Sequence, residues 1–174
     1  MKKKKILFDG NDIQIRIKEL GEEISALYND DKPILCVCVL KGAFMFFAEL
    51  VKHIKGEILV DFITLSSYGG TQTTGNVKLV NDIRESVLDR HVLIVEDIVD
   101  SGYTVEFLRK HFEAKNALSV NVACLIDKPL GRKVEAKADF KAFTMTGSEF
   151  IVGYGLDYNQ RFRNFGDILE VELE

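Results

Sequence analysis

Apolar and polar positions follow two different rhythms along the chain, and each rhythm predicts a different element. Across residues 11–28, five apolar side chains recur at intervals of four and three, which places them on one face of a helix. Residues 34–39 form a continuous apolar run, and a run this short is typical of a strand buried on both faces. The pattern then predicts a second helix over 43–54 and a strand over 58–65.

The second half of the chain repeats this alternation. It predicts strands over 77–80, 92–95, 119–126 and 140–143 and a helix over 103–114. Alternating strands and helices indicate an α/β fold with a doubly wound, mainly parallel central sheet and flanking helices, and such sheets bind ligands at the carboxyl ends of their strands. The chain has 174 residues, 47% of them hydrophobic, which is enough for one domain and few for two.

Composition and charge narrow the class of protein. A formal net charge of -4 argues against binding nucleic acid through a broad basic face. No apolar run approaches the roughly 20 residues needed to cross a bilayer. The basic run at 2–5 lacks the apolar core of a signal peptide, so it is expected to be a solvated tail of a cytoplasmic protein. Cys36, Cys38 and Cys124 have the spacing of neither a zinc site nor a disulfide framework, so buried reduced thiols are expected.

A loop of small residues, 101–104, joins the strand predicted at 92–95 to the following helix. Gly102 can adopt backbone angles that other residues avoid, and the amides at a helix N-terminus carry partial positive charge. The hydroxyls of Ser101 and Thr104 add two further donors. A loop with these properties suits a phosphate.

Three carboxylates, Glu96, Asp97 and Asp100, lie between that strand and the helix, in what the pattern indicates is an acidic turn. Beside a phosphate they would repel it unless they bound something else, such as sugar hydroxyls, a proton in transit or Mg²⁺. The plainer alternative is an ordinary strand-to-helix turn with Asp and Ser as capping residues. Capping needs only one carboxylate, so the three together favour a functional site.

The segment 96–104 resembles the phosphoribosyl-diphosphate motif of the type I phosphoribosyltransferases. Three further segments resemble the 6-oxopurine branch of that family, the bacterial-type hypoxanthine-guanine phosphoribosyltransferases: Leu40-Lys41-Gly42, 125–129, and 150–158 with Arg163 after it. The resemblance covers most of the chain. It implies purine salvage, in which the phosphoribosyl group of 5-phosphoribosyl 1-diphosphate passes to hypoxanthine or guanine and gives IMP or GMP and pyrophosphate.

The resemblance also implies roles around the sugar and its phosphates. Glu96 and Asp97 would hold the ribose hydroxyls and help to place Mg²⁺, and Asp157 would bind Mg²⁺ on the pyrophosphate side. Lys41, Gly42 and Arg163 would neutralise the diphosphate. The residues expected to bind phosphoribosyl diphosphate are Lys41, Gly42, Glu96, Asp97, Asp100, Ser101, Gly102, Tyr103, Thr104 and Arg163.

For the purine base, the resemblance places Asp100 opposite N7, where it would either accept the proton as a general base or stabilise charge without full transfer. Lys128 would donate to the 6-oxygen that distinguishes oxopurines from adenine. Phe150 would stack on the base and Ile151 would bind it through its backbone. The residues expected to bind the purine are Ile98, Lys128, Phe150, Ile151 and Asp157.

Two accessory parts are implied as well. A small base-binding hood would be formed by the N-terminal segment and about 128–174, and a flexible lid loop at about 66–76, carrying Ser67 and Tyr68, would close over the reacting centre. A plain hairpin connection is the alternative for the lid. Members of the family often have a cis peptide bond in the segment that corresponds to Leu40-Lys41.

Other functions stay open. One is a relative that prefers xanthine, and another is a regulator that keeps the fold to sense nucleotides and binds nucleic acid. A regulator needs a basic surface and no purine pocket, so the negative charge and the presence of Asp100 and Lys128 disfavour it. Because the family usually assembles as dimers or tetramers, a homodimer or homotetramer with no nucleic-acid or membrane partner is expected.

Overall fold

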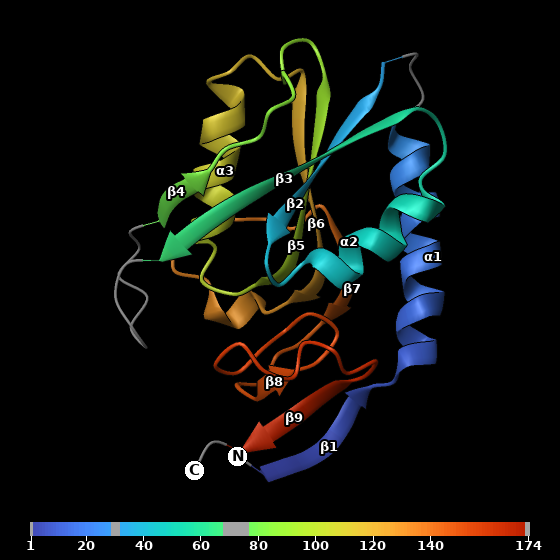
Figure 1. Cartoon of the computed structure of the whole chain (residues 1–174), viewed down its shortest axis with the longest axis vertical. Coiled ribbons are helices and arrows are strands. Elements are labelled where there is room, and N and C mark those ends of the chain that lie inside the picture. The colour runs from blue at the N-terminus through green and yellow to red at the C-terminus, as the bar shows by residue number, and fades with distance from the viewer. Residues whose placement is uncertain (1, 29–31, 68–76, 173–174) are drawn as a thin grey trace.

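A central six-stranded sheet forms the body of the protein (Figure 1). The computed structural model describes residues 2–28, 32–67 and 77–172. The strands lie in the order β4-β3-β2-β5-β6-β7, and every neighbouring pair is parallel except β3 with β4, which confirms the predicted mainly parallel sheet. The bounds are β2 Ile34–Leu40, β3 Ile58–Ser67, β4 Val77–Asn81, β5 His91–Val99, β6 Ser119–Asp127 and β7 Phe140–Thr144.

Helices cover both faces of this sheet, so the fold is doubly wound as predicted (Figure 1). The helices are α1 Gly10–Leu27, α2 Phe44–Leu50 and α3 Tyr103–Glu113. Strand β2 shows how the two layers form, because successive side chains of a strand point to opposite faces. Cys36 and Cys38 pack in the core beneath α1 and α2, whereas Leu35 and Val37 pack in the core beneath α3.

The second helix is shorter than its apolar pattern indicates. α2 ends at Leu50, and a 3₁₀ turn, η1 Val51–His53, replaces the last part of the helix predicted over 43–54. This turn packs tightly on α1, since a Cβ built on Gly21 would lie 2.5 Å from the Cβ of His53. Close contact between the two segments thus depends on a glycine in α1.

The central strand β5 is longer than predicted, and this changes the position of two acids. The sequence pattern ends the strand at residue 95 and places Glu96 and Asp97 in a turn. That prediction is wrong, because β5 stays paired with β6 through Val99. Glu96 and Asp97 therefore belong to a rigid strand, and only Asp100 lies in the loop.

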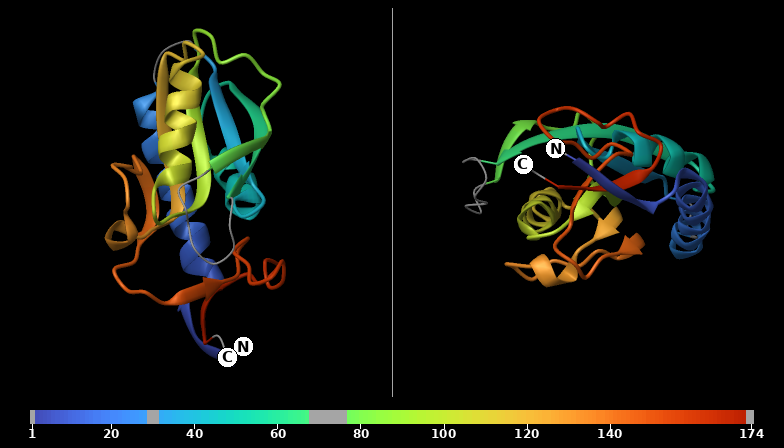
Figure 2. Two further views of the ribbon diagram at one scale, coloured as in Figure 1. Left: turned by 90° about the vertical axis from the view of Figure 1, so that its left-hand side faces the viewer. Right: turned by 90° about the horizontal axis from the view of Figure 1, so that it is seen from below.

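A second, antiparallel sheet lies at one end of the molecule, beyond the carboxyl ends of the central strands (Figure 2). Its order is β1-β9-β8, with β1 Lys2–Phe8, β9 Ile168–Glu172 and β8 Phe150–Val152. The prediction of a solvated N-terminal tail is wrong, because β1 pairs along its length with β9. Opposite charge assists this pairing, as Nζ of Lys5 lies 3.9 Å from Oε2 of Glu170.

The three cysteines are free and buried, which confirms the expectation of unpaired core thiols. Burial raises the pKa of Cys36 and of Cys38 to about 12, and it also raises the pKa of Cys124. These thiols therefore stay protonated and act as small apolar side chains. Over residues 2–28, 32–67 and 77–172, no helix is both long and apolar enough to span a membrane.

Candidate active site

The carboxyl ends of β2, β5 and β6 face the small sheet (Figure 1), and the segments singled out in the sequence follow them. Parallel strands bring their carboxyl ends to one edge of a sheet, so segments far apart in sequence meet there. A cavity of about 240 Å³ lies at this edge. Its lining includes Gly42, Glu96, Asp97, Thr104, Asp157 and Arg163, all of them predicted site residues.

Glu96 and Asp97 form an acidic pair at this cavity. Glu96 is only 7% exposed, and its Oε2 atom is buried with no hydrogen-bond partner among the described residues. Burial raises the pKa of Glu96, and the charge of Asp97 raises it further; burial also raises the pKa of Asp97. The charge of Arg163 lowers the pKa of Asp97, but burial outweighs it. Two carboxylates in this environment, one with a buried oxygen that has no partner, fit a divalent cation or the hydroxyl donors of a sugar.

The residues predicted to bind Mg²⁺, Glu96, Asp97 and Asp157, all line the first cavity. Among the described residues there is no group of three or more His, Cys, Asp or Glu placed to hold a metal ion. Asp157, the third predicted ligand, instead pairs with Arg163, whose Nη2 lies 2.7 Å from Oδ1. Mg²⁺ often keeps several waters and uses one or two carboxylates together with substrate phosphates. Glu96 and Asp97, with their unpartnered oxygen, fit such an ion.

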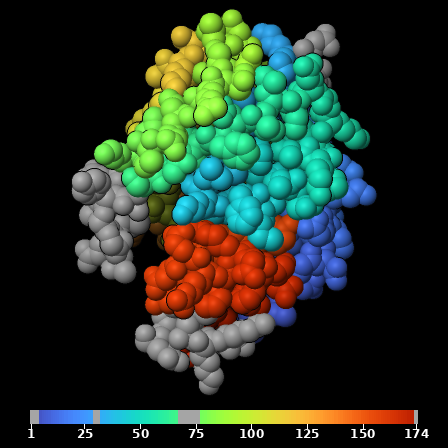
Figure 3. All heavy atoms as spheres, viewed as in Figure 1, coloured from blue at the N-terminus to red at the C-terminus, as the bar shows by residue number. Residues whose placement is uncertain are grey.

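Gly42 leaves the space that the Asp97 carboxylate occupies. A Cβ built on Gly42 would lie 1.6 Å from Oδ2 of Asp97, so a side chain there would displace the carboxylate. The preceding peptide bond, Leu40-Lys41, is cis, as the resemblance implies. The C-terminal segment packs on the same turn, because a Cβ on Gly155 would lie 2.1 Å from the carbonyl oxygen of Gly42. Figure 3 shows this segment, in red, directly against the residues that follow β2, in cyan.

The predicted phosphate loop leads into α3. Gly102 caps the helix with a φ of 89°, a left-handed conformation that favours glycine. The loop is held in place from outside, since the amide of Lys133 donates to the carbonyl of Ser101 at 2.9 Å. Tyr103 is the first residue of α3, and Thr104 in the first turn lines the cavity. The first amides of a helix lack intrahelical acceptors, so this end of α3 can bind an anion.

A second cavity, of about 560 Å³, contains the two residues predicted to act on the purine, Asp100 and Lys128. Asp100 is exposed and Lys128 is half-buried. Nζ of Lys128 donates to the carbonyl of Glu149 at 2.9 Å, and its amide donates to the carbonyl of Val99 at 2.9 Å. The rest of the lining comes from Leu130, Gly131 and residues 145–148. A volume of this size is common for small-molecule sites.

Of the other predicted purine-binding residues, Asp157 lines the first cavity, whereas Ile98, Phe150 and Ile151 line neither. Phe150 lies in β8, is 40% exposed and contacts Tyr158 edge to face, with the ring centroids 5.7 Å apart. Ile151 is buried, and Ile98 packs partly buried against the core beneath α1 and α2. A role in binding the base stays a prediction for all three.

The predicted diphosphate-binding cations share one acceptor. Nζ of Lys41 and Nη2 of Arg163 donate to Oε1 of Gln160, at 3.4 Å and 3.2 Å. Arg163 also donates through Nη1 to the carbonyl of Gly155 at 2.7 Å. The two positive groups are therefore held close together beside the first cavity.

The predicted lid falls mostly outside the described residues. Ser67 is the last residue of β3 and pairs with Val77 of β4, whereas Tyr68 lies outside the described part of the chain. Ser66 and Val77 line the first cavity. The hairpin strands that flank the predicted lid thus border the site.

Comparison with known proteins shows the family to which this chain belongs. A family model described as a phosphoribosyl transferase domain matches residues 5–159. The chain belongs to the phosphoribosyltransferase family. This phosphoribosyltransferase is 47% identical over 162 residues to the hypoxanthine-guanine phosphoribosyltransferase of Streptococcus thermophilus, which covers 92% of this chain and 89% of the relative. It is 46% identical over 161 residues to the enzyme of the same name from Bacillus subtilis, covering 92% of this chain and 88% of the relative.

A solved structure agrees with these relatives. A crystal structure of a hypoxanthine-guanine phosphoribosyltransferase from Bacillus anthracis superimposes on this phosphoribosyltransferase with a TM-score of 0.93 and 40% sequence identity. The match covers 98% of this chain and 100% of that chain. The type I phosphoribosyltransferase fold predicted from the sequence is thereby confirmed.

Two residues that contact predicted site residues of this phosphoribosyltransferase, Gln160 and Arg132, were not predicted from the sequence. Gln160 joins Lys41 to Arg163, and Arg132 hydrogen-bonds to the main chain of Asp100. Neither belongs to a recognisable pattern of spacing. The only available signal for Arg132 is its position four residues after Lys128.

Proposed function

We propose that this phosphoribosyltransferase acts in purine salvage and transfers the 5-phosphoribosyl group of 5-phosphoribosyl 1-diphosphate to N9 of hypoxanthine or guanine, releasing pyrophosphate. One observation carries the proposal: the segment 96–104 contributes to both cavities. It places an acidic pair and a helix N-terminus in the first cavity and Asp100, beside Lys128, in the second. The names of the relatives at 46–47% identity support the same reaction.

Breaking the bond at ribose C1 develops positive charge on the sugar and negative charge on the leaving diphosphate, so each needs an opposite charge nearby. Glu96 and Asp97 would accept hydrogen bonds from the ribose hydroxyls and offset the positive charge. The hydroxyls of Ser101 and Thr104 and the amides at the start of α3 would hold the 5-phosphate. In this arrangement the chain positions the sugar from both ends.

The diphosphate would be neutralised by fixed cations of the chain and by a metal ion. Lys41 and Arg163 supply two positive charges beside the first cavity. Glu96 and Asp97 are the residues that would hold Mg²⁺, and bound Mg²⁺ supplies charge neutralisation at the phosphate oxygens. The unpartnered, buried oxygen of Glu96 supports this assignment.

The base would be recognised in the second cavity. Asp100 would meet N7, either accepting its proton or stabilising charge there. Nζ of Lys128 would donate to the 6-oxygen of an oxopurine. Adenine carries a 6-amino group, which would set one donor against another and leave buried polar groups without partners. Selectivity for oxopurines follows from this mismatch.

Self-association, as a homodimer or homotetramer, is part of the proposal. Val60 and Phe62 are exposed on one face of β3, and Val80 of the neighbouring β4 and Phe44 of α2 are exposed as well. Apolar surface of this kind is typical of protein interfaces, and a second copy of the chain is the proposed occupant. Light scattering after size-exclusion chromatography measures the assembly, and a monomer at micromolar concentration would contradict it.

The proposed place of action is the cytoplasm, without a nucleic-acid or membrane partner. Three free, buried cysteines support a reducing compartment, and the net charge of -4 disfavours a nucleic-acid partner.

The proposal is tested by measuring pyrophosphate release with Mg²⁺, 5-phosphoribosyl 1-diphosphate and one of four bases: hypoxanthine, guanine, xanthine or adenine. Release with hypoxanthine or guanine but not adenine is the expected result. Release with xanthine alone would point to the xanthine-preferring relative. No release with any base, while nucleotide still binds, would assign the chain to the nucleotide-sensing regulators.

A further inference from the structure

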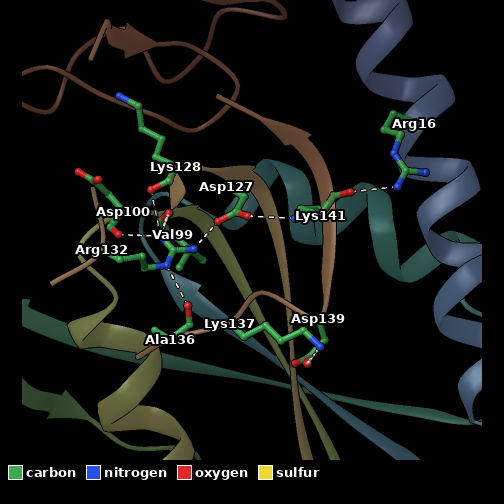
Figure 4. Close-up of polar contacts among 10 residues, drawn as sticks. All are labelled: Arg16, Val99, Asp100, Asp127, Lys128, Arg132, Ala136, Lys137, Asp139 and Lys141. Atoms are coloured by element: carbon green, nitrogen blue, oxygen red, sulfur yellow. Dashed lines mark hydrogen bonds and ion pairs between the residues drawn. The ribbon is translucent and has the colours of Figure 1, made fainter. Parts of the chain in front are cut away.

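Arg132 joins the two segments that carry Asp100 and Lys128. It follows η2 (Pro129–Gly131), and its side chain is 16% exposed. Its Nη1 lies within hydrogen-bond distance of the carbonyl of Val99, of the carbonyl of Asp100 at 2.6 Å and of the carbonyl of Lys128 at 3.3 Å (Figure 4). The first two carbonyls belong to the end of β5 and its loop, and the third follows β6. One nitrogen thus bridges both sides of the second cavity.

The guanidinium is itself held from two further directions. Nε donates to the carbonyl of Ala136 at 2.8 Å, and Nη2 donates to Oδ1 of Asp127. Asp127 is buried, and its other oxygen accepts from Nζ of Lys141 at 3.3 Å. All three nitrogens of the planar fork are therefore in use, and a lysine in this place cannot reproduce that set of contacts.

Two other contacts restrict the same pair of segments. The amide of Lys128 donates to the carbonyl of Val99 at 2.9 Å. A Cβ built on Gly131 would lie 1.7 Å from Oδ1 of Asp100, so the Asp100 carboxylate occupies the space that this glycine leaves. In Figure 4 the side chains of Asp100 and Lys128 both extend away from Arg132. The arginine therefore acts on the main chain and leaves both functional groups open to the cavity.

We propose that Arg132 is a positioning residue of this transferase, which sets the spacing between the Asp100 carboxylate and the Lys128 ammonium by holding the main chain of both. The proposal rests on the proposed function, because the roles at N7 and at the 6-oxygen come from there. A reacting group displaced by about 1 Å can lose about a hundredfold in rate, so a loosened tether has a measurable effect. Arg132 would act through the main chain and contact neither substrate.

Arg109 provides a matched control. Its guanidinium donates to the carbonyls of Val120 at 2.5 Å and Lys137 at 3.1 Å and pairs with Asp139 at 2.5 Å. Its side chain is 24% exposed, so burial is similar to that of Arg132. It joins α3 to β6 and to the segment before β7 and lines neither cavity described above. A change to lysine there loses the same kind of fork contacts without touching the site.

The experiment compares Arg132→Lys and Arg109→Lys in steady-state kinetics and in melting temperature. For Arg132→Lys, kcat/KM for hypoxanthine should fall about tenfold and the preference for hypoxanthine over adenine should shrink. The KM for 5-phosphoribosyl 1-diphosphate should change less than kcat/KM for hypoxanthine does, since the groups that Arg132 contacts do not line the first cavity. The two variants should lower the melting temperature by similar amounts. Arg109→Lys should leave all kinetic constants near wild type.

A second variant keeps the test decisive if Arg132→Lys does not fold. Asp127→Asn removes the charge that holds Nη2 and should cause a smaller fall in kcat/KM for hypoxanthine. Where Arg132→Lys folds, the two losses should be less than additive in the double variant, because both act through the same tether. Where it does not fold, Asp127→Asn alone should lower kcat/KM for hypoxanthine and the preference over adenine, and wild-type values of both would overturn the positioning role. Wild-type kcat/KM and selectivity in Arg132→Lys, or fully additive losses, would overturn the positioning role. Failure of the proposed function would appear separately, as no turnover of hypoxanthine by the wild-type protein.

Discussion

The two cavities at the edge of the central sheet differ in how their polar groups are satisfied. In the first, Glu96 and Asp97 are like charges side by side, and burial together with mutual repulsion raises the pKa of Glu96. Around the second, Arg132, Asp127 and Lys128 all have hydrogen-bond partners within the chain. The first cavity therefore depends on its ligands to give the buried Glu96 oxygen a partner, whereas the second is organised by the chain before any ligand binds.

This contrast predicts different responses to mutation. Changes in the first cavity should alter the binding of sugar, phosphate or metal ion. Removing a carboxylate there should raise the melting temperature when no cation is present and lower it, relative to wild type, when a cation is bound. Changes in the second cavity should alter the rate with a purine base and the choice between bases. The four predictions below test that division, beginning with the largest expected effect.

Asp100→Asn should lower kcat about 10²–10⁴-fold, because asparagine has similar size but cannot accept the N7 proton or supply its negative charge. Asp100 is exposed, so the melting temperature should stay near wild type. Pre-steady-state and steady-state pyrophosphate release measure the effect. Undiminished turnover would remove Asp100 from the mechanism and leave the second cavity with a recognition role only.

Gly42→Ala should lower kcat/KM for 5-phosphoribosyl 1-diphosphate by about a hundredfold, because the new Cβ takes the position of the Asp97 carboxylate oxygen. The preference among bases should not change. Gly166→Ala is the control, since a Cβ there meets no atom within 4 Å. Equal effects of the two substitutions would show that the position of Asp97 does not limit the reaction.

Lys128→Ala should lower the preference for hypoxanthine over adenine by about tenfold or more, the usual range for losing a hydrogen bond to a charged group. The KM for 5-phosphoribosyl 1-diphosphate should stay within about twofold of wild type. Competition between the two bases in one reaction measures the change most directly. Selectivity at the wild-type level would place the recognition of the 6-oxygen elsewhere.

Glu96→Gln removes the negative charge of Glu96 and keeps the size of its side chain. Its effect, a change in melting temperature, should be the smallest of the four. The raised pKa of Glu96 means that the folded protein binds this proton more tightly than the unfolded chain, so the carboxyl group costs stability as the pH rises through the folded-state pKa. Without Mg²⁺, Glu96→Gln should therefore melt a few degrees above wild type at higher pH, at roughly 2–4 °C per kcal/mol, and the difference should vanish at low pH.

Added Mg²⁺ should reverse the order of the two melting temperatures. It should raise the melting temperature of the wild-type protein more than that of Glu96→Gln, because a ligand stabilises the state that binds it. Differential scanning fluorimetry at several pH values, with Mg²⁺ or with EDTA, measures both effects without any turnover. An equal response of the two proteins to Mg²⁺ would rule out Glu96 as a metal-binding residue.

The sequence predicted the central sheet better than the small one, and the reason is the range of the interactions. Strands β2 and β6 are runs of apolar residues whose burial follows from their own composition. β1 is mostly lysine, and only its pairing with β9, more than 150 residues away, makes it a strand. Local patterns carry no information about such a partner.

The residues of the candidate site also divide into those that local patterns predicted and those that depend on distant contacts. The motif residues in 40–42 and 96–104 were predicted, and the structure gathers Gly42, Glu96, Asp97 and Thr104 in one cavity. Arg132 and Gln160 were not predicted, because their importance comes from the distant groups they contact. Glu96, Asp97 and Asp157 line the same cavity, and the pairing of Asp157 with Arg163 there could not be foreseen from the sequence.

The sequence by itself determined the order of strands and helices, the acidic and small-residue motif after the central strand, and the family that this motif indicates. These depend on neighbouring residues, whose apolar spacing and turn chemistry are local. Only the tertiary structure decided that Glu96 and Asp97 lie in a strand, that burial raises the pKa of both, and that Arg132 ties Asp100 to Lys128. Those properties arise from pairing and burial between distant segments, where distance in space and removal of water set the energies.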